Sequence, residues 1–301
     1  MKTKTIMAAI FAAIIIVVGG GFAIASYLEN RPVVFNDPAL EQAVRTNIGI
    51  SDRPITHKEA KQYVALDLAL MQGYTKEIRD LTGLSAFSNL TKLNLENNMI
   101  TDTDELGRLK KMQFLDLSGN QISDVSGLSS LVNLEFLDLE GNKASDISPL
   151  KRLKNLTVLD LRDNQISDIS SLSAMKEMKC LYLRKNDIRD ITPLQALVKL
   201  TYLSLGENEI EDIEPVRDMK SLDHLLVCYN RIDDISVLQD LPGLKYLEVQ
   251  GNPIDPGFTL DDMADRCEVI QRSPDRLDWH DMTCHLDPEA PRYKPSDSTN
   301  E

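Results

Sequence analysis

An asparagine recurs every 22 residues through the middle of this 301-residue chain, with no insertion or deletion. The eight copies are Asn98, Asn120, Asn142, Asn164, Asn186, Asn208, Asn230 and Asn252. A leucine stands five positions before each of them and a leucine or valine stands three before, as in Leu137 and Leu139. A repeated unit of this size leaves an apolar face that only its neighbours can cover. The chain is therefore expected to fold as a stack of similar units.

Within each unit, the leucine-x-leucine alternation is typical of a short strand with one buried face, and stacking would pair these strands in parallel. An asparagine buried at the following bend offers a donor and an acceptor to backbone groups that the turn leaves unpaired. Aspartates stand four positions after most of these asparagines: Asp102, Asp124, Asp146, Asp168, Asp190, Asp212 and Asp234. They are expected to cap a tight turn rather than to bind calcium, because no calcium-loop spacing accompanies them.

The stretches LEFLDLEGNKASDISPLKRL and LTVLDLRDNQISDISSLSAM carry the whole repeat pattern. They resemble the leucine-rich repeat in its 22-residue class. The resemblance covers more than half of the chain. It implies a curved α/β solenoid with a parallel sheet on the concave face and short helical turns or loops on the convex face. A fold of this kind does not by itself define a function.

A small helical cap is expected over residues 31–72. Asp37 and Pro38 form a helix start, and Thr56 with Glu59 forms a capping box that opens a second helix over THKEAKQYVALDLAL. A helical cap followed directly by 22-residue repeats is similar to the internalin-like proteins of bacteria. The solenoid would span residues 73–254, with a degenerate first unit in KEIRDLTGL followed by eight regular repeats.

The amino terminus predicts export. Two lysines precede an uncharged, apolar run that ends at Leu28, so residues 1–28 are expected to form a signal peptide or a membrane anchor. Ala23-Ile24-Ala25 fits a cleavage site, whereas the length of the run also suits an uncleaved anchor with its lysines in the cytoplasm. Both alternatives place the rest of the protein outside the cytoplasm. It would be anchored to the membrane in one case and secreted or periplasmic in the other.

Residues 255–286 are expected to form a carboxyl-terminal cap, and the polar residues 287–301 a disordered tail. A disulfide between Cys267 and Cys284 is expected in an exported chain. A zinc site that includes the nearby His280 and His285 is the alternative. The other two cysteines, Cys180 and Cys228, lie two repeats apart, too far for a disulfide, and are expected to be free thiols.

Positions six, four, two and one before each asparagine should point out of the concave face, because alternation along a strand puts the leucines inward. Large apolar residues have no structural reason to be there, and a strand spacing of ~4.8 Å would join them into an exposed stripe. Concave aromatics hold a protein ligand in internalin-like proteins, and Phe114, Phe136, Tyr182, Tyr202 and Tyr246 match that arrangement by their position in the repeat. The expected partner-binding residues are Phe114, Asp116, Phe136, Asp138, Val158, Asp160, Arg162, Tyr182, Arg184, Tyr202, His224, Tyr229 and Tyr246. The alternative is that they are partly packed residues of a rigid scaffold.

Charge and carboxylate spacing argue against two classes of function. A formal charge of −14 argues against nucleic-acid binding. Asp116, Asp138 and Asp160 would be spaced much like the carboxylates of a retaining glycosidase, but an open, shallow face cannot exclude water. We therefore expect a monomeric, non-enzymatic protein-binding module of the cell envelope or exterior, with no cofactor and no metal. The alternatives are a regulatory subunit that docks on an enzyme such as a type-1 protein phosphatase, which the apolar amino terminus disfavours, and a structural envelope protein without a dedicated ligand.

Overall fold

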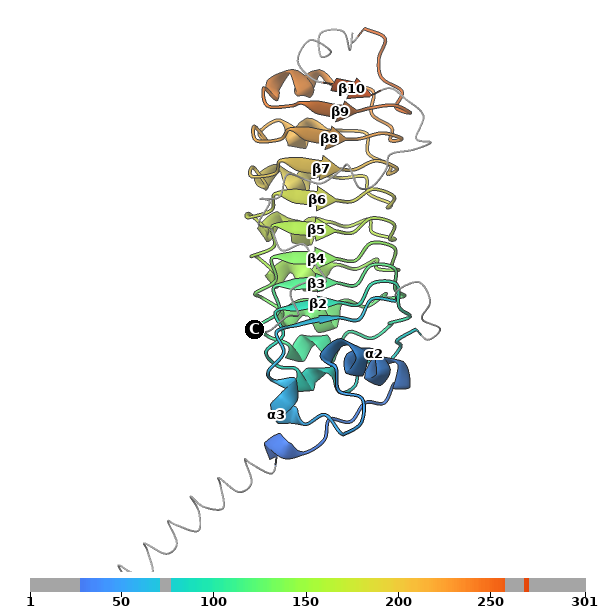
Figure 1. Cartoon of the computed structure of the whole chain (residues 1–301). Coiled ribbons are helices and arrows are strands. Elements are labelled where there is room, and N and C mark those ends of the chain that lie inside the picture. Colours follow the sequence, from blue (N-terminus) through green and yellow to red (C-terminus); the bar gives the residue numbers. More distant parts are fainter. Residues whose placement is uncertain (1–27, 71–76, 258–267, 271–301) are drawn as a thin grey trace, which may run out of the picture.

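A computed structural model describes residues 28–70, 77–257 and 268–270. In these residues ten three-residue strands form one parallel sheet whose spatial order follows the sequence. Figure 1 shows them as the rungs of one ladder, with the helices α2 and α3 at its amino-terminal end. The strands are Ala65–Asp67 (β1), Lys92–Asn94 (β2), Phe114–Asp116 (β3), Phe136–Asp138 (β4), Val158–Asp160 (β5), Cys180–Tyr182 (β6), Tyr202–Ser204 (β7), His224–Leu226 (β8), Tyr246–Glu248 (β9) and Glu268–Ile270 (β10). The molecule is a curved leucine-rich repeat solenoid, as the repeat pattern predicts.

The inward leucines set the register of the sheet. Leu93 lies opposite Leu115, which in turn lies opposite Leu137, and the pairing continues in this way to β9. Each of these leucines is fully buried in one continuous core that extends from Val33 to Val249. A one-residue slip would turn every leucine to the open face, so the hydrophobic pattern fixes the register.

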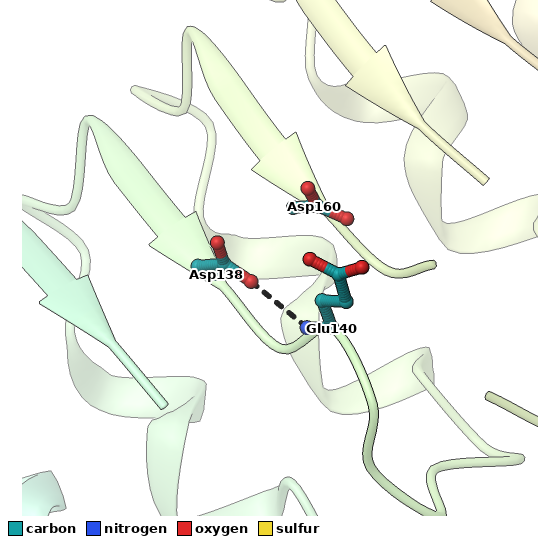
Figure 2. Close-up of side chains that lie close together, drawn as sticks. All are labelled: Asp138, Glu140 and Asp160. Carbon is teal, nitrogen blue, oxygen red and sulfur yellow. Dashed lines mark hydrogen bonds between the residues drawn. The ribbon is translucent and has the colours of Figure 1, made fainter. Parts of the chain in front are cut away.

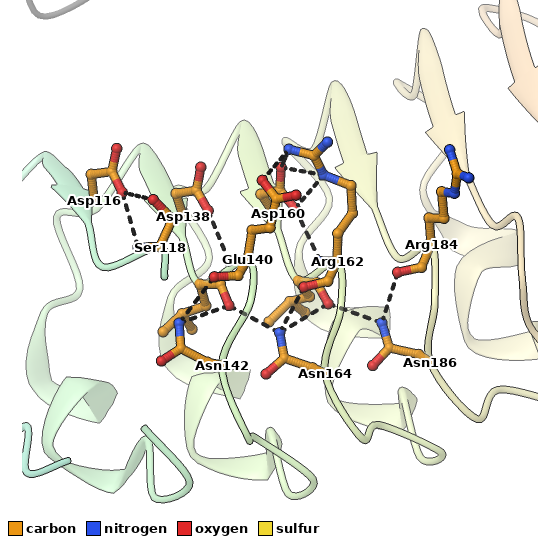
Figure 3. Close-up of polar contacts among 12 residues, drawn as sticks. Asp116, Ser118, Asp138, Glu140, Asn142, Asp160, Arg162, Asn164, Arg184 and Asn186 are labelled. Carbon is orange, nitrogen blue, oxygen red and sulfur yellow. Dashed lines mark hydrogen bonds and ion pairs between the residues drawn. The ribbon is translucent and has the colours of Figure 1, made fainter. Parts of the chain in front are cut away.

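Each ladder asparagine joins its own repeat to the one before it. The Asn142 amide nitrogen donates to the carbonyls of Leu117 at 3.0 Å and of Leu139 at 3.0 Å, and its oxygen accepts from the Ile122 amide at 2.9 Å. Figure 3 shows the amide nitrogens of Asn142, Asn164 and Asn186 bonded to backbone carbonyl oxygens. The predicted asparagine ladder is thus confirmed.

The convex side is made of short 3-10 helices. They span Leu84–Ala86 (η1), Leu106–Arg108 (η2), Ser126–Ser130 (η3), Ser148–Arg152 (η4), Ser170–Ala174 (η5), Thr192–Ala196 (η6), Glu214–Val216 (η7) and Ser236–Asp240 (η8). The repeat aspartates cap the turns that lead into them, as at Asp146, whose carboxylate accepts from the Ser148 amide at 2.8 Å. The same contact recurs at the other six, so the predicted turn-capping role is confirmed.

The amino-terminal cap begins as predicted. Helix α2 spans Pro38–Ile48, with Asp37 accepting from the Ala39 amide at 2.7 Å. Helix α3 spans His57–Ala60 and opens with the Thr56–Glu59 capping box.

The predicted second helix is too long, however. It ends at Ala60, and the residues after it form β1, which pairs with β2. Leu66 and Leu68 are both buried, so they carry the leucine-x-leucine signal of a first repeat. This first repeat breaks the regular interval, because Leu66 stands 27 residues before Leu93 instead of 22.

At the other end, β10 continues the sheet past the last ladder asparagine. Apart from Leu28, the predicted signal or anchor segment lies outside the described residues, as do Cys267, Cys284 and the tail 287–301. Among the helices of the described ranges, none has both the length and the apolar character to cross a bilayer.

Candidate protein-binding face

The structure brings the predicted binding residues together on the concave face. Ten of them lie on strands β3 to β9, and the other three, Arg162, Arg184 and Tyr229, lie two or three residues past the ends of β5, β6 and β8. Strand alternation positions all of them except Tyr229, because each has an inward leucine as a neighbour along the chain; Tyr229 lies at the bend, with a positive φ.

The aromatic residues form two groups along this face. The Phe114 and Phe136 rings are stacked, with centroids 4.2 Å apart and an interplanar angle of 7°. Further along, Tyr182, Tyr202, His224 and Tyr246 make a continuous series with centroid separations of 4.9, 5.4 and 5.5 Å. Val158 and Cys180 lie between the two groups on β5 and β6.

The expectation of a solvent-exposed stripe is wrong. Val158, Cys180, Tyr202 and Leu226 are buried and form a second apolar cluster, separate from the leucine core, with Phe136, Tyr182 and Tyr246 packed against it. Phe114 is also buried, with 9% of its surface exposed, and of the predicted residues only Tyr229 reaches 36%. Part of the cause is the stack itself, since each ring covers the face of the next.

Three carboxylates run beside the phenylalanines in direct cross-strand register, Asp116 opposite Asp138 and Asp138 opposite Asp160. Burial raises the pKa of Asp138 well above its usual range, and the negative charges of Asp160 and Asp116 raise it further. Burial likewise raises the pKa of Asp116. Like charges opposite one another destabilise a sheet, so this file of aspartates is unfavourable for folding.

Arg162 reverses the charge in the middle of the face. Its guanidinium contacts the Asp160 carboxylate at 2.5 Å and the Glu140 carboxylate at 2.7 Å, and it lies 5.3 Å from the centroid of the Tyr182 ring. Burial raises the pKa of Asp160, whereas the hydrogen bond from Arg162 lowers it. Next along the face, Arg184 pairs with Glu207 at 2.5 Å.

Three carboxylate oxygens, one each from Asp138, Glu140 and Asp160, lie within 4.8 Å of one another. Figure 2 shows the three side chains gathered at β4 and β5. Such a group could hold a cation. Here Arg162 already bonds to two of the three carboxylates, so the cluster belongs to an ion-pair network (Figure 3).

The two repeat cysteines differ from each other. Cys228 is a free thiol, as predicted; it is buried and donates to Glu248 at 3.5 Å, and burial raises the pKa of this thiol to about 12. Cys180 was expected to be free, but it is disulfide-bonded to a partner outside the described residues.

The predicted set also missed residues that belong to the face. Leu226 and Glu248 occupy the same column as the aspartates, and both are buried. Glu140 and Glu207 hold the two arginines. A search for opposite charges about one repeat apart would have found these two glutamates.

Comparison with known protein families identifies the class of protein to which this chain belongs. A family model described as "Leucine Rich repeats (2 copies)" matches residues 110–152, 154–195 and 176–218, and another described as "Leucine rich repeat" matches residues 199–254. A search of curated proteins found no significant match. Together with the sheet and the asparagine ladder, these matches define a leucine-rich repeat protein, a fold that serves as a protein-interaction scaffold.

Solved structures define the family. Internalin C2 from Listeria monocytogenes is similar over 74% of this chain and 98% of its own, with 33% identity and a TM-score of 0.69. The chain belongs to the internalin-like family of leucine-rich repeat proteins.

More distant structures share the fold. A leucine-rich repeat protein of Leptospira interrogans matches 70% of this chain and 62% of its own, with 21% identity and a TM-score of 0.60. The ectodomain of the Arabidopsis thaliana receptor kinase GASSHO1/SCHENGEN3, solved in complex with CASPARIAN STRIP INTEGRITY FACTOR 2, matches 56% of this chain and 22% of its own. Its identity is 26% and its TM-score is 0.50.

Proposed function

We propose that this chain is a non-enzymatic binding module of the cell envelope or exterior that recognises a protein through its concave face. Membership of the internalin-like family and the protein-interaction role of the repeat fold support this proposal. The apolar, lysine-preceded amino terminus supports a place outside the cytoplasm. The partner is expected to contact the predicted residues of β3 to β5 first, with the module acting as a monomer.

One observation indicates the chemical character of the partner. An aromatic stack lies beside carboxylates whose pKa values are raised. Burial raises the pKa of Glu96, Asp116 and Asp138, and neighbouring negative charge adds to each shift. A cation placed among these groups would relieve their repulsion. The favoured ligand is therefore a protein segment that combines lysine or arginine with apolar side chains.

The direct test uses two synthetic peptides of equal apolar content, one bearing lysines and the other glutamates. The lysine peptide should bind, and binding should weaken as salt is added, because the attraction is partly electrostatic. The Asp116→Asn/Asp138→Asn double variant should lose at least about tenfold in affinity, equivalent to about 1.4 kcal/mol. Equal binding of both peptides, or an unaffected double variant, would contradict the proposal.

A cross-linking experiment locates the face in cells. A photoreactive phenylalanine at position 136 should give one discrete protein adduct on intact producing cells, and the Asp116→Asn/Asp138→Asn changes should abolish it. The control places the same group at position 132, an exposed valine with 42% of its surface accessible. The same adduct from both positions would argue against a concave binding site.

Cell fractionation tests the location. The protein should be found outside the cytoplasm, and sequencing its mature amino terminus would separate a cleaved signal from an uncleaved anchor. Recovery of the unprocessed chain in the soluble cytoplasmic fraction would contradict this part of the proposal and would favour the enzyme-regulator alternative.

A further inference from the structure

We infer that a ridge of lysines and valines, along the turns that enter the strands, binds the surface of a membrane that contains anionic lipids. The ridge consists of the residues twelve positions after six successive ladder asparagines: Lys110, Val132, Lys154, Lys176, Val198 and Lys220. This is a second face of the solenoid, and its role does not depend on protein binding at the concave face.

The ridge residues stack along one side of the solenoid. Each lies four residues before a strand and directly follows a fully buried leucine or methionine that anchors its turn. Hydrogen bonds join neighbouring turns, since the Asn133 amide nitrogen donates to the Lys110 carbonyl at 2.8 Å and the Asn155 amide nitrogen to the Val132 carbonyl at 2.9 Å. All six ridge side chains are exposed. Five strand spacings therefore place them in one line about 24 Å long.

The middle of the ridge is strongly basic, although the whole chain has a formal charge of −14. The segments that lead from η3, η4 and η5 to the following strands span residues 126–135, 148–157 and 170–179. Their cationic residues are Lys151, Arg152, Lys154, Lys176 and Lys179. All five are exposed, and none of them forms an ion pair with another described residue. The segments hold two acids, and Glu177 already pairs with Lys199 at 2.6 Å, which leaves Glu135 to oppose the five cations.

The two valines indicate which anionic partner fits. Val132 is 42% exposed and Val198 49%, and both stand in line with the lysines. A soluble polyanion gains little from an exposed valine, whereas an apolar side chain between lysines can enter the boundary between lipid headgroups and acyl chains. Lysine suits such a surface because it is a compact point charge that needs no paired acceptor geometry. The combination favours a bilayer with anionic headgroups.

Membrane contact along the ridge would orient the solenoid. Each strand from β3 to β8 begins four residues after a ridge residue and ends four residues before a ladder asparagine. The strands would therefore run away from the bilayer, and the ladder that they form in Figure 1 would lie lengthwise along it. The concave face would stand beside the membrane, where a partner can reach it.

Vesicle sedimentation tests the ridge. The full-length protein is mixed with vesicles of phosphatidylcholine and phosphatidylglycerol, and with vesicles of phosphatidylcholine alone. It should bind the anionic vesicles more tightly, and added salt should weaken the binding. Lys154→Glu/Lys176→Glu should lose at least about tenfold in affinity, because each lysine near an anionic surface contributes about fivefold. Equal binding to the two kinds of vesicle would overturn the inference.

The matched control is Lys143→Glu/Lys185→Glu, which changes the net charge equally at two exposed lysines beside the ladder asparagines. It should lose less than about twofold in affinity, because these positions lie farther from the ridge than salt allows charges to act. Any contribution of the apolar amino terminus is the same in every variant. Equal losses in the two double variants would show that net charge alone matters, and the ridge would then have no role.

Val132→Ser/Val198→Ser separates a membrane from a soluble polyanion. These exposed substitutions should weaken binding to anionic vesicles at least about threefold, because they remove apolar surface that enters the bilayer. Binding to soluble polyphosphate should be weak and should not change. If polyphosphate binds the wild type as tightly as the vesicles do, and the valine changes have no effect on either, the ridge binds an anionic polymer and the membrane assignment is wrong.

Discussion

At the scale of single residues, stability depends on polar side chains buried at repeated positions. The ladder asparagines satisfy backbone groups that the bends leave unpaired, whereas the concave aspartates oppose one another across the strands. The first arrangement stabilises the stack and the second destabilises it. Removing an asparagine amide should therefore lower the free energy of unfolding, whereas neutralising an aspartate should raise it.

Asn142→Ala should lower the free energy of unfolding by about 3 kcal/mol, because it leaves the buried Ile122 amide without its acceptor. The control is Asn133→Ala, an exposed side chain whose amide donates to the Lys110 carbonyl. It should cost less than about 1 kcal/mol. Urea unfolding of both variants measures the difference, and similar losses would contradict a ladder role.

Asp138→Asn should stabilise the protein by about 1 kcal/mol at neutral pH, because it removes charge repulsion across the strands. The sign follows from the raised pKa of Asp138. The folded state binds the proton more tightly than the unfolded state, so this carboxyl favours folding below its unfolded pKa and loses that contribution as pH rises through its folded pKa.

The advantage of Asp138→Asn should therefore grow from pH 4 to pH 7 in thermal unfolding scans. Asp146→Asn is the control of opposite sign, because the hydrogen bond from the Ser148 amide lowers the pKa of Asp146. Its carboxylate favours folding above the unfolded pKa, and that contribution is lost as pH falls. A benefit of Asp138→Asn that does not vary with pH would refute the electrostatic explanation.

At the scale of elements, each repeat is a strand, a bend and a 3-10 helix that must match its neighbours closely. The residue before every ladder asparagine has a positive φ, and only three of the eight, Gly119, Gly141 and Gly251, are glycine. On the convex side, η3 approaches the turn before η2 so closely that a Cβ at Gly127 would lie 2.5 Å from the Thr103 carbonyl carbon and oxygen. Backbone cannot move aside as readily as a side chain.

Gly127→Ala should therefore cost about 3 kcal/mol through overpacking. Gly141→Ala is the matched control: its nearest neighbours lie at 3.7 Å, and only the positive φ of 66° opposes the substitution. It should cost about 1 kcal/mol. Both values can be measured by chemical denaturation, and an equal cost would mean that the convex packing adjusts easily.

At the scale of the whole molecule, a solenoid is stabilised by contacts between neighbours, so its ends need caps. Asp37 joins the amino-terminal cap to the first repeat. One carboxylate oxygen accepts from the Ala39 amide of α2, and the other accepts from the Arg79 and Asp80 amides at 2.7 and 3.1 Å.

Asp37→Ala should release the cap and cost about 2 kcal/mol, because it removes both a helix cap and the link to the repeat. Hydrogen exchange should rise in 38–48 and in β1 before it rises in the central repeats. Asp52→Ala, at an exposed turn residue, is the control and should change neither. Uniform exchange along the whole solenoid would show that the cap does not protect this end.

The sequence alone determined the features that depend on neighbours along the chain. The 22-residue period, the inward leucines, the asparagine ladder, the aspartate turn caps and both helix starts are local patterns, and each follows from backbone geometry. The concave direction of Phe114 or Tyr202 follows from the same alternation.

Only the tertiary structure decided how far those side chains are buried. Alternation gives the direction in which Tyr202 points but contains no information on which distant atoms lie against it. The entry of 65–67 into the sheet could not be predicted either, because Leu66 lies outside the regular 22-residue spacing. The direction of a side chain is encoded within its own repeat, whereas its burial depends on every part of the chain that packs against it.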